Sequence, residues 1–135
     1  MSWDVLLMRL PADVASLEEL PEGFVPPPLG APAEVRAALA AAVPELDFAD
    51  PSWGRITGDD FSIEVSVDAD EPVGTVMLHV RGGDGALPVV GAMVAALGVS
   101  AIDCGPGTLL LLDSPAAAAS FAAWRDYRDD VVDDA

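Results

Sequence analysis

Residues 53–81 read WGRITGDDFSIEVSVDADEPVGTVMLHVR, and this stretch gives the clearest indication of the architecture. Apolar and polar side chains alternate along residues 60–67, and they alternate again along residues 74–81. Strict alternation is typical of a strand that is buried on one side only. Together with residues 53–57, the pattern predicts a three-stranded antiparallel meander with one apolar face and one polar face.

The turn between the first two of these strands fixes which residues lie opposite each other. A two-residue turn at Gly58-Asp59 places Arg55 opposite Ser62. If the inward residues of the next strand stay in line, Ser62 then lies opposite His79. The polar face is therefore predicted to gather the candidate site residues, which are Trp53, Arg55, Ser62, Glu64, His79 and Arg81.

This predicted face carries two of the six arginines and the only histidine of the chain. Local positive charge of this kind can attract an anionic ligand or a carboxylate of a partner. The plainer alternative is that Arg81 with Asp60, and Arg55 with Glu64, form ordinary cross-strand pairs on a solvated sheet.

Apolar periodicity and turn residues predict the other elements. They are a buried central strand at 3–9, helices at 32–43 and 86–97, strands at 99–103 and 108–112, and a last helix at 115–128. The leucine run at 108–112 does not alternate, so we expect it in a central position of the sheet. Residues 45–52 are predicted to be an acidic loop.

The pattern as a whole indicates a single α+β domain over residues 1–135. We expect a two-layer sandwich, in which helices cover one face of a mostly antiparallel sheet in the order β-α-β-β-β-α-β-β-α. Residues 11–30 contain the Pro26-Pro27-Pro28 triplet and are predicted to form a proline-rich surface strap. Residues 129–135 are predicted to be a frayed acidic tail.

Several short motifs resemble those of a group of small, uncharacterised bacterial proteins. These are the opening Met1-Ser-Trp-Asp4, the strand Asp60-Phe-Ser-Ile63, and Asp103-x-Gly-x-Gly107 followed by a leucine strand and Ser114-Pro115. The resemblance implies a shared small α+β domain. It brings no activity and no functional residues with it.

Charge restricts the partners of the chain more than any motif does. There are 23 carboxylates against six arginines and no lysine, which gives a formal charge of −17 at pH 7. Such a field repels phosphate backbones and anionic membranes, so we expect no nucleic acid and no membrane partner. It favours basic proteins, but a GC-rich genome or adaptation to salt explains an acidic composition equally well.

The residues that usually carry catalysis are few. Cys104 is the only cysteine, which excludes an intrachain disulfide and any multi-cysteine metal site. It can in principle act as a nucleophile with His79 as its base, but a single structural cysteine is the commoner use. Residues 68–72 lack the calcium-loop pattern, and residues 81–85 lack the P-loop pattern and are predicted to form a flexible connection. We therefore expect no catalytic residue, metal or cofactor.

These observations favour a non-catalytic acidic module that binds, or inhibits, a basic protein. The alternative is a domain that binds a small anionic ligand, or a modest enzyme, that uses the outer sheet face near His79 and Arg81. A homodimer through the same face is a third reading. The longest apolar run, residues 86–99, is shorter than the ~20 residues of a membrane span, and no basic N-terminal region indicates a signal peptide, so we expect a cytoplasmic protein.

Overall fold

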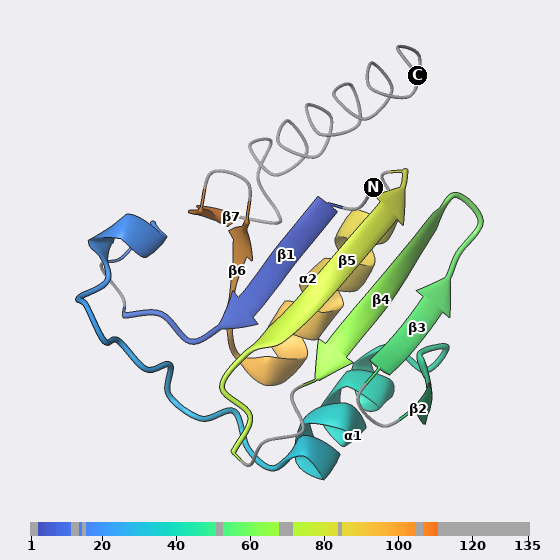
Figure 1. The fold of residues 1–135 in the computed structure, drawn as a ribbon. Helices are drawn as coiled ribbons and strands as arrows, with labels where there is room; N and C mark the ends of the chain where they lie inside the picture. The colour runs from blue at the N-terminus through green and yellow to red at the C-terminus, as the bar shows by residue number, and fades with distance from the viewer. Residues whose placement is uncertain are drawn as a thin grey trace.

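The computed structural model describes residues 3–11, 14, 16–50, 53–67, 72–83, 85–104 and 107–110, and within them the strands form one seven-stranded sheet (Figure 1). The sheet order is β2-β3-β4-β5-β1-β6-β7, and every registered pair is antiparallel. The strands are β1 (Trp3–Met8), β2 (Asp47–Asp50), β3 (Trp53–Thr57), β4 (Phe61–Val67), β5 (Val76–Gly82), β6 (Ser100–Asp103) and β7 (Thr108–Leu110).

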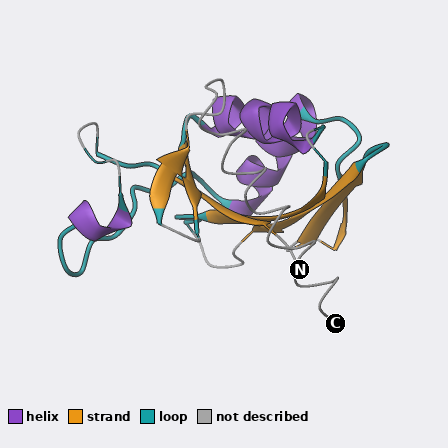
Figure 2. Ribbon diagram, turned by 90° about the horizontal axis from the view of Figure 1, so that it is seen from above, coloured by secondary structure: helices purple, strands orange, loops and turns teal. Residues whose placement is uncertain are grey.

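Among the described residues, two α-helices cover one face of this sheet, as Figure 2 shows from above. They are α1 (Pro32–Ala42) and α2 (Ala86–Leu97), which also contact each other. Val35 and Leu39 of α1, and Val90 and Met93 of α2, are buried in the same core cluster as the inward side chains of the central strands. The two-layer α+β architecture is therefore confirmed, and the helices lie on one face of the sheet.

The helix ends follow their local sequence. Proline stands at the first position of α1, where its missing N–H costs no hydrogen bond. Gly98 ends α2 in the left-handed conformation with φ of +61°, which glycine adopts without strain. Both helices begin and end within one residue of the predicted ranges.

The strand β2 lies where we expected an acidic loop at 45–52, so that prediction was wrong. The strand is short and its register shifts, and it carries aspartate at both ends. Phe48 packs against the core between the exposed residues Asp47 and Ala49. Because this short strand has aspartate at both ends, its alternation is hard to recognise in the sequence. Charged residues on a short edge strand commonly prevent unwanted pairing with another strand.

The leucine strand β7 was expected in a central position, and this prediction was also wrong. Among the described strands, β7 lies at one edge of the sheet. Leu110 faces the helices and is buried, whereas Leu109 lies opposite Ile102 on the other face. Ile102 is only 1 % exposed, so this end of the sheet is buried on both faces. Burial on both faces removes the alternation that normally marks an edge strand.

The proline-rich strap joins two distant parts of the sheet. It begins near the 3-10 helix η1 (Leu17–Glu19), where Ser16 bridges to Thr108, and it ends where Gly30 bridges to Val73. The predicted hairpin tip at 68–71, the helix at 115–128 and the tail at 129–135 lie outside the described residues. In the described part of the chain, no helix has the length and apolar character needed to cross a membrane.

Candidate functional site

The candidate site lies on the sheet face that points away from α1 and α2, which we call the outer face. Strands β3, β4, β5 and β1 bring three rows of side chains to it. The rows run Thr57–Ser62–Arg81, then Arg55–Glu64–His79–Asp4, then Trp53–Ser66–Met77–Leu6. All six residues predicted from the sequence belong to these rows, because alternation along a strand determines the face on which each side chain lies.

The pairing within the rows differs from the predicted one. Ser62 lies opposite Thr57 and Arg81, not opposite Arg55 and His79. The turn is centred on Asp59-Asp60, with the Gly58 N–H donating to the Phe61 carbonyl oxygen at 2.9 Å. The register is thus displaced by two residues, and an even displacement leaves every side chain on its predicted face.

Glu64 is the shared partner of both arginines on this face. Its Oε1 lies 3.0 Å from Nη1 of Arg81 and 3.9 Å from Nη2 of Arg55. The side chains of Glu64, Arg81 and Arg55 are 22 %, 43 % and 64 % exposed. Only the Arg81 contact has hydrogen-bond length, so Arg81 is bound firmly and Arg55 loosely.

His79 is held from two sides. Its Nδ1 lies 2.8 Å from Oδ1 of Asp4, and its ring stacks on Trp53 with centroids 5.7 Å apart and an interplanar angle of 27°. Trp53 stands on β3 and His79 on β5, so the indole reaches across β4, where its direct neighbour is the small Ser66. Asp4 was not among the predicted site residues, because Asp4 joins the face through the pairing of β1 with β5, and His79 lies 75 residues away in the chain.

The charge of the outer face is not the positive exception that the sequence suggested. Asp4 and Glu64 lie in the same row as Arg55, and Asp47 of β2 lies opposite Arg55. Among the described residues of these strands, three carboxylates therefore stand against two guanidinium groups, with His79 counted as neutral. This described part of the face has the negative sign of the whole molecule.

Cys104 and His79 are not placed as a nucleophile and its base. The Cys104 N–H donates to the Asp4 carbonyl oxygen at 3.1 Å, so β1 separates the cysteine from His79 by two strand spacings, roughly 10 Å. Partial burial raises the pKa of the Cys104 thiol, and the charges of Asp4 and Asp103 raise it further. A raised thiol pKa reduces the thiolate fraction that nucleophilic attack requires.

The glycine-rich segment after β5 is packed, although the sequence predicted a flexible connection. The Gly83 N–H donates to the Asp60 carbonyl oxygen at 2.6 Å. The carboxylate of Asp60 lies so close to Gly83 and Gly85 that a Cβ on either glycine would collide with it. The chain's own carboxylate thus lies beside the start of α2, where an outside anion would approach.

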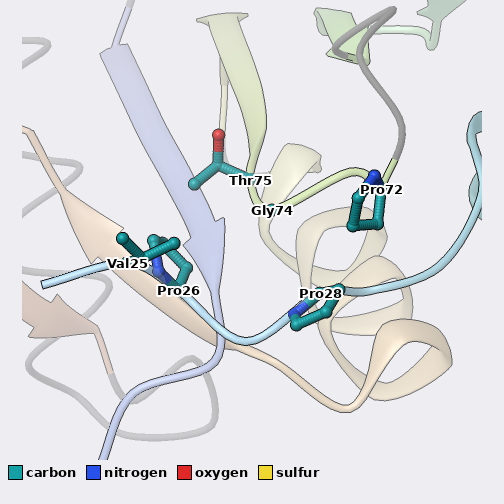
Figure 3. Close-up of a pocket in the computed structure, with 6 residues that line it drawn as sticks. All are labelled: Val25, Pro26, Pro28, Pro72, Gly74 and Thr75. Carbon is teal, nitrogen blue, oxygen red and sulfur yellow. The ribbon is translucent and has the colours of Figure 1, made fainter.

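A hollow of about 360 Å³ lies away from the outer-face rows, between the strap and the start of β5 (Figure 3). Its lining is apolar except for Thr75, and it consists of Val25, Pro26, Pro28, Pro72, Gly74 and Thr75. None of the six predicted site residues lines it. Among the residues that the structure describes, no three His, Cys, Asp or Glu side chains are grouped closely enough to hold a metal ion.

Comparison with known proteins finds no matching family model, no matching curated protein and no matching solved structure. The function has to be argued from the outer face itself.

Proposed function

We propose that this protein is a non-catalytic module that binds a basic protein through the outer face of its sheet. The observation that carries the proposal is Trp53, an aromatic side chain that is 36 % exposed on a face with more carboxylates than arginines. Exposed tryptophans are frequent anchors of protein interfaces, because one side chain contributes a large contact area.

Charge supports a basic partner over an acidic one. The chain carries −17, and the outer face has the same sign. Complementary charge speeds the encounter of two proteins and disfavours partners of like charge, which include nucleic acids. The same repulsion acts between two copies of this chain, so a homodimer through the outer face is the weaker proposal.

The alternative function, binding or conversion of a small anion near His79 and Arg81, has less support. Arg81 already contacts Glu64, and His79 already contacts Asp4. An incoming anion has to displace these carboxylates or approach beside them, against the field of the molecule. A basic side chain is attracted by that field. Glu64 and Asp4 already have partners, of which Arg55 is the most loosely held.

The proposal includes a cytoplasmic setting, to which a free cysteine such as Cys104 is suited. It makes no use of a cofactor or a metal ion, and it assigns no catalytic residue.

The test is capture of a partner from native lysate by immobilised protein at low and at high salt. We expect a basic protein, identified by mass spectrometry, to be retained at low salt and released at high salt. Trp53→Ala should lose this protein. Val25→Ala should retain it, since Val25 is 79 % exposed and lies on the strap, and neither change alters the net charge. Equal retention by both variants, or no basic protein at low salt, would contradict the proposal.

A further inference from the structure

The ion pair between Arg55 and Glu64 on the outer face is weak. Arg55 and Arg81 make their closest approach to the same carboxylate oxygen of Glu64, and the Arg55 contact of 3.9 Å is too long for a hydrogen bond. The Arg55 side chain is also the most exposed of the three. An exposed pair of this length contributes at most about 1 kcal/mol, so Arg55 leaves Glu64 at little cost.

Glu64 has capacity for a second strong partner. A carboxylate offers about four acceptor sites on its two oxygens, and arginine can bind both oxygens at once in a planar fork. Arg81 occupies Glu64 from the β5 side, whereas the looser Arg55 approaches it from β3. The β3 side of Glu64 is therefore the side that a cation from a partner can occupy.

Trp53 provides an aromatic surface next to this side. Its indole reaches across β4 to stack on His79, and His79 lies directly opposite Glu64. Trp53 and Glu64 thus stand on neighbouring strands, in adjacent rows of the same face, and His79 contacts both Trp53 and Asp4. A guanidinium group can pair with a carboxylate and stack on an indole, whereas an ammonium group is a compact charge without a planar surface.

We infer that Arg55 occupies the position that an arginine of the partner takes on binding. The partner's arginine then stacks on Trp53 and replaces Arg55 at Glu64. This inference rests on the proposed function and names the chemistry of the contact at its centre. The partner is then a protein that presents an exposed arginine, and lysine at that position is a poorer substitute. Arg55 competes with the partner's cation for Glu64, and because its contact is weak the effect of this competition on affinity is small.

The test uses octa-arginine and octa-lysine as probes, titrated calorimetrically into the full chain at low ionic strength. We expect octa-arginine to bind more tightly than octa-lysine. Trp53→Ala should weaken octa-arginine binding by about two- to tenfold, while Trp53→Phe, which keeps an aromatic face, should weaken it less. Arg55→Ala should strengthen octa-arginine binding, since it removes the competing cation.

The matched control is Arg36→Ala, which makes the same change of net charge on α1, in the layer that covers the opposite face of the sheet. Octa-arginine should bind the Arg55→Ala variant about two- to fivefold more tightly than it binds the Arg36→Ala variant. This difference corresponds to the free energy of one exposed ion pair. Equal effects of the two arginine variants, or equal affinity for the two probes, would overturn the inference and leave the proposed function standing. If neither probe binds at low ionic strength, both the inference and the proposed function are contradicted.

Discussion

At the scale of single residues, Asp4 links His79 on the outer face to Cys104. Its carboxylate bonds His79, its carbonyl oxygen accepts the Cys104 N–H, and its charge raises the pKa of the Cys104 thiol. The row Arg55–Glu64–His79–Asp4 therefore ends beside the only cysteine. Sequence reasoning could find the outward side chains of the meander, but it had no local signal that joins β1 to them.

The raised pKa of Cys104 predicts slow alkylation. Partial burial is the largest cause, followed by the negative charges of Asp4 and Asp103, so at a mildly alkaline pH less thiolate is present than in a free cysteine. Iodoacetamide should react with Cys104 more slowly than with a cysteine peptide, and Asp4→Asn should speed the reaction. Asp47→Asn is the control, because it removes a carboxylate that is not among these causes. Equal rates for the two variants would show that Asp4 does not act on the thiol.

The raised pKa of the Cys104 thiol also makes the stability of the fold depend on pH. The folded chain holds the Cys104 proton more tightly than the unfolded chain does, so the contribution of this thiol to stability is fully present below its ordinary pKa. It is lost as the pH rises through the raised pKa.

At the scale of elements, the alternation of apolar and polar residues predicted the sheet face on which each side chain lies, but not which residue lies opposite it on the next strand. The strands at 53–57, 60–67 and 74–81 appear within two residues of their predicted bounds, and both described helices match closely. The register of the meander depends on where the chain turns. That position is determined by packing of Asp60 and Phe61 against glycines that lie more than twenty residues later, which no local pattern reveals.

The connection from β5 to α2 yields a stability prediction. Gly82 has a φ of +100°, and a Cβ there would collide with the backbone of Asp60 and Phe61. Gly82→Ala should reduce the free energy of unfolding by about 2 kcal/mol or more, as measured by urea denaturation. Gly91→Ala is the matched control. Gly91 lies inside α2 with nothing within 4 Å of its Cβ position, so alanine should stabilise the protein by up to about 1 kcal/mol. Similar effects of the two changes would contradict the packing described for Gly82.

At the scale of the whole molecule, repulsion among carboxylates opposes the compact state. The 23 carboxylates are balanced by only six arginines, as at Glu64, and such exposed pairs contribute little each. Sodium chloride screens both effects, with a Debye length of ~10 Å at 0.1 M. Because the repulsion involves many more groups than the pairs do, we expect Tm to rise with salt in thermal melts. A Tm that stays constant or falls would show that the acidic groups do not strain the fold.

We propose that the outer face around Trp53, and not the acidity of the whole surface, binds a basic partner. Nuclear magnetic resonance mapping with octa-arginine tests it most directly, since each amide reports its own environment. We predict that shift changes concentrate on Trp53, Arg55, Glu64 and His79 and leave α1 and α2 unchanged. Changes spread over exposed carboxylates on every side, with none at Trp53 or His79, would contradict the claim.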